Sequence, residues 1–283
     1  MTVGVEVHAT GTIPVASAAQ PPRFELWHIS KGFETPGGFR PVLDGIDLKA
    51  TSGSFISIIG PSGCGKSTLF NVMAGLEPAD AGRVYVDGQE AGGKREHFGY
   101  MPQKDLLFPW RTILDNTTIG LEVQGKPRKE ARVAAAKLFE PFGLAGFEHA
   151  RPFELSGGMR QRAALLRTVV QEREILLLDE PFGALDSLTR LEMQTWLAEV
   201  WVKYRWTVVM VTHDVREAVY LSDQVVVLSA RPTKVRLVKD ITLPRPREEA
   251  LMATPEFAAI ERELLEVLHE ESRHALQTQR VTV

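Results

Sequence analysis

A glycine-rich loop that ends in a lysine and a hydroxyl is the first group of residues able to do chemistry. Residues 60–67 read Gly-Pro-Ser-Gly-Cys-Gly-Lys-Ser and match the pattern G-x-x-x-x-G-K-[ST]. In such a loop, backbone N–H groups surround phosphates, the lysine meets their charge and the hydroxyl ligates Mg²⁺. An ordinary glycine-rich turn is the alternative, and the lysine and hydroxyl disfavour it. The predicted nucleotide contacts are Gly60, Pro61, Ser62, Gly63, Cys64, Gly65, Lys66, Ser67 and Thr68.

Two consecutive carboxylates follow a short apolar run further along the chain. Ile175–Leu178 is followed directly by Asp179 and Glu180. Parallel α/β sheets place their chemistry at the carboxyl ends of buried strands, so both acids are expected beside the glycine-rich loop. Asp179 can hold Mg²⁺ through its water shell, and Glu180 can polarise an attacking water and accept its proton. A structural cap on the strand is the alternative.

A third segment, residues 155–162, reads Leu-Ser-Gly-Gly-Met-Arg-Gln-Arg and leads into a helical pattern. Ser156 is a good helix N-cap, which is the simple structural interpretation. A serine followed by two glycines at the start of a helix also forms an end that can accept phosphate. On the residues alone, both interpretations stay open.

The elements that must position these residues alternate between strands and helices. Phe55–Ile59 predicts a strand directly before the glycine-rich loop, and residues 67–74 predict a helix after it. Alternating patterns at Phe24–Ile29 and Val42–Leu48 predict an antiparallel β-layer. Further strands are expected at 175–178, 208–211 and 225–228, with helices at 190–204 and 215–221 between them. We therefore expect an α/β fold of the RecA-like P-loop class, with a mostly parallel sheet, an antiparallel β-layer and an inserted helical subdomain at about 104–165.

The bulk properties exclude several classes of protein. With 33 Lys and Arg against 36 Asp and Glu, the net charge of −3 offers no whole-protein field for nucleic acid. The apolar runs fall short of the roughly 20 residues of a membrane-spanning helix. Residues 1–22 read as a disordered tail without a secretion signal, and the one cysteine, Cys64, agrees with a reducing compartment. We expect a cytoplasmic protein whose core domain spans 23–245 and is followed by a helical extension at 246–283.

Taken together, these segments resemble the ATPases of the ABC family over roughly residues 24–245, and residues 155–162 resemble its signature sequence. Gln103 matches the Q-loop glutamine, Asp186 in Gly183–Asp186 matches the D-loop, and His213 matches the switch histidine. Phe33 stands where an aromatic ring stacks on adenine, although Phe39 is a rival. Five motifs in the expected order are far more specific than any one of them.

The resemblance implies a role for each matched residue. Lys66, Glu180 and His213 would be catalytic, and Ser67, Gln103 and Asp179 would surround the Mg²⁺ ion beside ATP. Two copies of the chain would pair face to face. The residues that would then reach the ATP of the opposite subunit are Ser156, Gly157, Gly158 and Asp186. A separate transmembrane permease and a solute-binding protein would complete the assembly on the cytoplasmic face of the membrane, without nucleic acid.

The segment after Gln103, Leu106-Leu-Phe-Pro-Trp110, indicates which branch of the family this chain resembles. It looks like the branch of nitrate, sulfonate and taurine importers, with the loop facing the permease; an apolar loop that packs on its own helices is the alternative. An exporter subunit and a soluble ABC ATPase acting on nucleic acid or ribosomes remain rival functions. Ser54 and Thr168 depart from the branch pattern at positions that carry no catalysis. The solute stays open, with bicarbonate and a pyrimidine precursor also possible.

Overall fold

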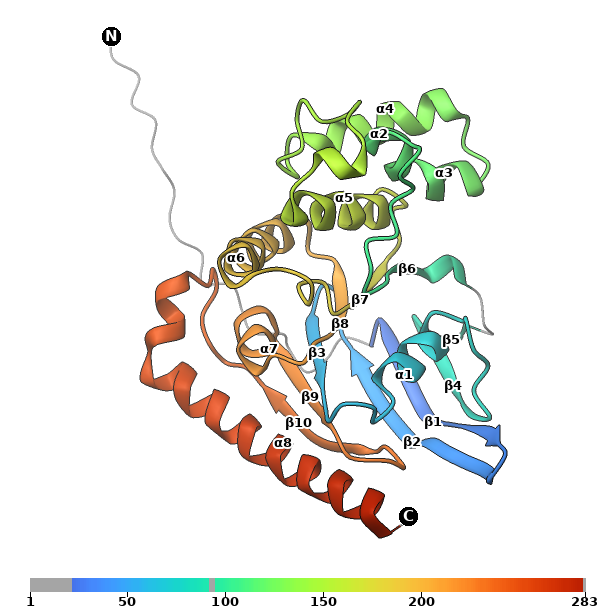
Figure 1. Cartoon of the computed structure of the whole chain (residues 1–283), viewed down its shortest axis with the longest axis vertical. Helices are drawn as coiled ribbons and strands as arrows, with labels where there is room; N and C mark the ends of the chain where they lie inside the picture. Colours follow the sequence, from blue (N-terminus) through green and yellow to red (C-terminus); the bar gives the residue numbers. More distant parts are fainter. Residues whose placement is uncertain (1–21, 92–94, 282–283) are drawn as a thin grey trace.

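Two β-sheets form the frame of the fold, and a group of helices covers one end of it (Figure 1). The computed structural model describes residues 22–91 and 95–281. Residues 1–21, nearly all of the segment expected to be a tail, lie outside the described residues. No helix in the described part of the chain is both long enough and apolar enough to cross a membrane.

The larger sheet has six strands in the order β10-β9-β3-β8-β7-β6. Its strands are β3 (Phe55–Ile59), β6 (Phe98–Met101), β7 (Ile175–Asp179), β8 (Thr207–Val211), β9 (Gln224–Leu228) and β10 (Val235–Asp240). All neighbours pair in parallel except β10, which runs antiparallel to β9. Every residue of β3, β7 and β8 is buried, because helices cover both faces of a parallel sheet. The α/β class predicted from the sequence is confirmed.

The smaller sheet is antiparallel, with strand order β2-β1-β4-β5. Its strands are β1 (Phe24–Thr35), β2 (Gly38–Ala50), β4 (Ala81–Val86) and β5 (Gln89–Glu90). Asp87 and Gly88 join β4 to β5 with φ values of 49° and 74°, the left-handed conformation that a tight two-residue hairpin requires. The predicted antiparallel β-layer is therefore present.

Helices fill the remaining layers around the two sheets. Those packed on the sheets are α1 (Lys66–Met73), α6 (Ser187–Tyr204) and α7 (Val215–Leu221). The group at one end comprises α2 (Ile113–Thr117), α3 (Ile119–Val123), α4 (Arg128–Phe139) and α5 (Gly157–Val169). Buried Asp115 joins α2 to α4 within this group, because it accepts hydrogen bonds from Arg128 at 3.0 Å and from Arg132 at 2.7 and 2.9 Å.

The chain ends in a 3₁₀ turn, η3 (Glu249–Ala253), and the long helix α8 (Pro255–Val281). Figure 1 shows α8 running along the outside of α7, β9 and β10. Phe257 and Leu264 on α8 are fully buried and join the main core. The helix is thus packed onto the sheet and not displayed as a free appendage.

The edge strands β6 and β10 of the larger sheet were not predicted from the sequence. β6 is four residues long and contains Gly99, and β10 alternates between half-buried and exposed residues. Neither carries a strong local strand signal. Pairing with β7 and β9 determines both strands, because an edge position of an existing sheet satisfies their backbone groups.

Candidate active site

The glycine-rich loop connects β3 to α1 and closes around the side chain of Lys66. The Lys66 ammonium donates hydrogen bonds to the carbonyl oxygens of Gly60 at 2.8 Å and Pro61 at 3.1 Å. Burial lowers the pKa of Lys66, and the charges of Glu180 and Asp179 oppose this shift. The loop therefore holds one desolvated cation at the start of a helix, opposite two carboxylates.

Close packing explains two glycines of this loop, Gly60 and Gly65. Gly65 has a φ of 129°, and a Cβ atom there would lie 2.8 Å from Cγ1 of Val42. A Cβ atom on Gly60 would lie 3.0 Å from Cβ of Leu228. Cys64 between them is buried, which raises the pKa of its thiol, so it serves here as a small apolar side chain.

The two acidic residues lie at the end of β7, as the sequence predicted. Asp179 is the last residue of the strand and is buried, and it accepts a hydrogen bond from the Tyr100 hydroxyl at 3.3 Å. Burial and the neighbouring charge of Glu180 raise the pKa of Asp179. No sequence pattern indicated Tyr100, which reaches Asp179 only because β6 pairs with β7.

Glu180 contacts two other predicted site residues, Gln103 and His213. Its carboxylate accepts a hydrogen bond from Nε2 of Gln103 at 2.8 Å, and Nε2 of His213 lies 2.5 Å from its other oxygen. Gln103, Glu180 and His213 follow the neighbouring parallel strands β6, β7 and β8. Glu180 itself has a φ of 46°, an uncommon conformation for a residue other than glycine and one that is concentrated at functional sites.

A buried network supports the loop that carries His213, and sequence reasoning missed it. The Thr212 hydroxyl donates to Glu217 on α7 at 2.5 Å and accepts from the backbone N–H of Asp214 at 3.0 Å. Gln194 on α6 donates to the other oxygen of Glu217 at 3.0 Å. Burial raises the pKa of Glu217 to about 7. This carboxyl group therefore joins α6, α7 and the residue before His213.

The signature segment, residues 155–162, and the D-loop residues 183–186 lie against each other in the same chain. Ser156 caps α5 by accepting from the N–H of Met159 at 3.2 Å, and Asp186 caps α6 by accepting from Thr189 at 3.1 Å. A Cβ atom on Gly158 would lie 2.9 Å from Cγ2 of Thr189. Both segments therefore begin helices that pack closely.

Neither cap is bonded to the cluster around Glu180. Among the described residues, no hydrogen bond or ion pair links Ser156 or Asp186 to Lys66, Glu180 or His213. The Lys66 loop and the signature segment are thus two separate regions of the chain.

The two candidate aromatic residues lie on the hairpin of β1 and β2. Phe33 and Phe39 are both exposed. The Phe39 ring covers the backbone of Gly32, where an added Cβ atom would lie 2.3 Å from Cζ of the ring. The Phe33 ring faces Nζ of Lys31, 5.4 Å from the ring centre. Stacking of Phe33 on adenine stays a prediction.

Residues 106–110, here called the aromatic loop, present apolar side chains to the outside. Trp110 is 69% exposed, and its ring stacks on that of Phe108 at 5.1 Å. The amide of fully buried Asn116 accepts from the N–H of Phe108 at 2.6 Å and donates to its carbonyl at 3.1 Å. Arg167 also donates to the carbonyl of Leu106 at 2.8 Å. The backbone of the loop is thus fixed while its rings remain accessible.

The donors for Mg²⁺ fit an ion that also binds phosphate. In the part of the chain that the structure describes, no cluster of three or more His, Cys, Asp or Glu side chains could hold a metal ion. Mg²⁺ commonly uses one or two protein oxygens together with water and substrate phosphates. Asp179 at the end of β7 and exposed Ser67 in the first turn of α1 carry such oxygens.

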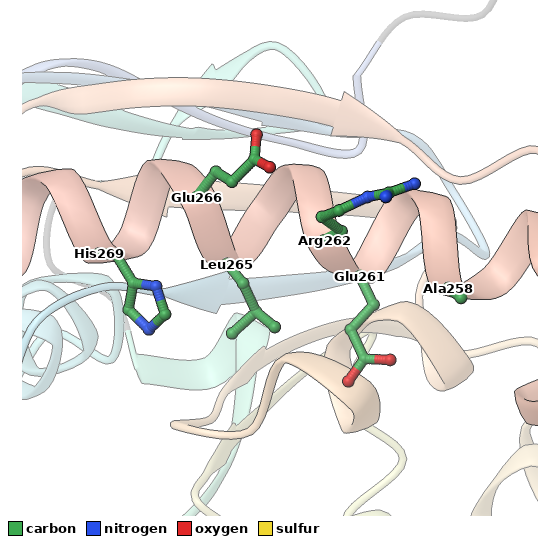
Figure 2. A pocket seen from close by; sticks show the side chains of 6 residues that line it. All are labelled: Ala258, Glu261, Arg262, Leu265, Glu266 and His269. Carbon is green, nitrogen blue, oxygen red and sulfur yellow. The ribbon is translucent and has the colours of Figure 1, made fainter.

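The cavities in the described structure do not coincide with the charged groups around Lys66 and Glu180. A cavity of about 350 Å³ lies along α8, where Glu261, Leu265 and His269 project from one side of the helix (Figure 2). A larger one of about 650 Å³ lies between α6, α7 and η3 and is lined in part by Arg190 and Asp214. Neither includes the Lys66 loop. We assign the site from the convergence of charged groups, because a phosphate-binding loop is a shallow surface feature.

Comparisons with known proteins agree with this geometry. The family model described as ABC transporter matches residues 43–183. The chain is 42% identical to the formylaminopyrimidine import ATP-binding protein ThiZ of Halalkalibacterium halodurans, over 82% of this chain and 92% of that protein. It is 41% identical to the aliphatic sulfonates import ATP-binding protein SsuB of Bacillus subtilis, over 83% and 90%. A dimeric ATP-binding cassette bound to ADP and Pi superposes with a TM-score of 0.67 and 27% identity, covering 78% of this chain and 99% of that one.

Proposed function

The chain belongs to the ABC transporter family and is an ATPase, and from this premise we propose that it is the ATP-hydrolysing subunit of an importer of a small solute. Its relatives are import ATP-binding proteins for formylaminopyrimidine and for aliphatic sulfonates. The solute differs between these relatives although both resemble this chain equally well. We therefore propose the importer class without assigning one solute.

One observation carries the proposed hydrolytic role, namely the convergence of Gln103 and His213 on the carboxylate of Glu180. Glu180 would act as the base that orients the attacking water and accepts its proton. Lys66 would bind the β- and γ-phosphates of ATP, and its low-dielectric surroundings would strengthen that attraction. Ser67, Asp179 and Gln103 would surround Mg²⁺, which supplies neutralisation of phosphate charge when bound.

A second copy of the chain would complete each site. Ser156 is exposed at the N-cap of α5, ahead of half-buried Gly157 and buried Gly158, and exposed Asp186 is the N-cap of α6. Both are separate from the Lys66 loop of their own chain, as a segment that serves a partner's ATP would be. The relative of known structure that binds ADP and Pi is itself dimeric. We propose a homodimer with two ATP molecules between the copies.

The aromatic loop would be the contact to a transmembrane permease on the cytoplasmic face of the membrane. Exposed Phe108 and Trp110 supply the rigid aromatic surface that protein interfaces favour. Their position after Gln103 would connect the permease to Glu180 through a single short segment. A solute-binding protein would deliver the solute to that permease.

Replacing Glu180 with Gln tests the hydrolytic role. The variant should bind ATP as the parent does, lose at least about 100-fold in hydrolysis and accumulate as a dimer in ATP. Glu172→Gln, which changes an exposed residue before β7, is the matched control and should hydrolyse normally. Hydrolysis by Glu180→Gln at the parent rate would show that another group activates the water.

Purification of the tagged chain from detergent-solubilised membranes of its native host tests the assignment to a transporter. An integral membrane subunit should be recovered with it, and Trp110→Ala should reduce that recovery. Recovery with ribosomes or nucleic acid, and without a membrane protein, would contradict the transporter assignment.

A further inference from the structure

Thr233 is a fully buried polar residue in the turn between β9 and β10. Its hydroxyl donates a hydrogen bond to the carbonyl oxygen of Cys64 in the phosphate-binding loop. Its backbone N–H donates to the carbonyl of Val42 at 2.8 Å, and its carbonyl accepts from the N–H of Asp44 at 2.9 Å. Thr233 therefore ties the phosphate-binding loop to β2 from a position more than 160 residues further along the chain.

The strands β9 and β2 also support the phosphate-binding loop by packing. Gly60 approaches Leu228 at the end of β9, and Gly65 approaches Val42 on β2. The hydroxyl of Thr233 is the polar contact between these two apolar ones. The loop thus contacts the end of β9, the turn after it and β2, at one point each.

The direction of the Cys64 carbonyl matters for phosphate binding. A carbonyl and the N–H of the following residue belong to one planar trans peptide unit and point in opposite directions. A carbonyl of Cys64 that is bonded to Thr233 therefore directs the N–H of Gly65 away from Thr233. Phosphate-binding loops bind phosphate through backbone N–H groups that point into the loop.

The C-terminal helix fastens the turn that carries Thr233. Glu271 on α8 is buried and accepts from the N–H of Ala230 at 3.1 Å and from Nε of Arg236 at 3.1 Å. Ser229 closes the same turn, with its N–H donating to the carbonyl of Lys234 at 2.9 Å. A continuous series of contacts therefore runs from α8 through the turn to the phosphate-binding loop.

We propose that Thr233 is a positioning residue for the phosphate-binding loop, and that Glu271 on α8 holds Thr233 in place and so sets the affinity for ATP. This inference rests on the proposed role of residues 60–67 in binding the phosphates. It gives the helical extension a purpose in the nucleotide site, although the extension lies outside the segment that resembles the ATPase core. Neither residue touches the nucleotide, and both act through Cys64.

Thr233→Val and Thr233→Ser form the test. Valine keeps the shape and removes the hydroxyl, so the Kd for ATP measured by titration calorimetry should rise about tenfold while kcat changes less than about twofold. Serine keeps the hydroxyl and should restore the Kd to within about twofold of the parent. An unchanged Kd in Thr233→Val, or an equal loss in both variants, would overturn the role of the hydroxyl.

Lys66→Ala separates this inference from the proposed function. It should abolish measurable ATP binding in the same calorimetric assay. If Lys66→Ala binds ATP normally, the assignment of the phosphate-binding loop is wrong. If Lys66→Ala fails to bind and Thr233→Val binds like the parent, only the positioning role is wrong.

Glu271→Gln tests the contribution of α8, with Glu270→Gln as the matched control on the exposed side of the helix. We expect Glu271→Gln to raise the Kd for ATP about threefold and Glu270→Gln to leave it unchanged. Combined with Thr233→Val, Glu271→Gln should add little, because both act on the same carbonyl. Equal effects of the two glutamate variants, or full additivity with Thr233→Val, would refute the link from α8.

Discussion

Replacing Glu217 with Gln should change how the stability of this protein depends on pH. Glu217 is 4% exposed, and its carboxyl group accepts hydrogen bonds from Thr212 and Gln194. Arg190, 3.9 Å away, favours the charged form, while Asp214 disfavours it. Burial outweighs these contacts and raises the pKa from 4.5 to about 7.

The magnitude follows from this rise in the pKa. Each pKa unit corresponds to about 1.4 kcal/mol, so ionised Glu217 costs the folded state about 3 kcal/mol. Between pH 4.5 and about 7, the carboxyl group of Glu217 keeps its proton in the folded state and has lost it in the unfolded state. The free energy of unfolding therefore falls as the pH rises through this range. Glutamine cannot ionise and loses one accepted hydrogen bond, which costs about 1 kcal/mol.

Urea unfolding of the parent and of Glu217→Gln at pH 5 and pH 8 measures the effect. The two proteins should be about equally stable at pH 5, and the variant should be about 2 kcal/mol more stable at pH 8. Glu34→Gln, at an exposed position on β1, should show no such change with pH. A difference in stability between parent and Glu217→Gln that is the same at both pH values would refute the reasoning.

Two further substitutions test other parts of the site. Ser156→Ala in the Glu180→Gln background should leave the ATP affinity of the monomer within about twofold of the parent. It should prevent the ATP-dependent dimer, because the serine would contact the partner's nucleotide. A dimer that still forms at the same ATP concentration would contradict the two-chain site. Asn116→Ala should lower the free energy of unfolding by about 2–3 kcal/mol and speed amide exchange of Phe108, because the Phe108 backbone loses both bonds to this amide. Slow exchange of the Phe108 amide in this variant would show that other contacts fix the aromatic loop.

Local patterns in the sequence were sufficient for the central elements of the fold. Phe55–Ile59 was predicted as a strand with the bounds that β3 has, and the helix after Lys66 begins within one residue of its expected start. Such continuous apolar runs, with glycines at their ends, have few alternatives in a soluble α/β fold. The edge strands β6 and β10 were not predicted, because their strand conformation depends on the neighbouring strand with which each one pairs.

The order of the motifs predicted candidate site residues, three of which the structure brings into contact. Lys66, Asp179, Glu180, Gln103 and His213 were all named from sequence, and the structure places Gln103 and His213 on Glu180. The residues that were missed are those without a local pattern. Tyr100 beside Asp179 and Glu217 behind Thr212 look like ordinary core residues until the strands and helices are packed.

The sequence by itself predicted the chemistry, because the glycine-rich loop and the paired carboxylates each require particular residue types at short spacing, and the order of the motifs added the histidine. Only the tertiary structure decided which distant residues hold that chemistry in position. Thr233 contacts Cys64 across 169 residues of the chain, and Glu271 contacts Ala230 across 41. Hydrogen bonds of this kind depend on the final packing of separate elements, and no spacing in the sequence encodes them.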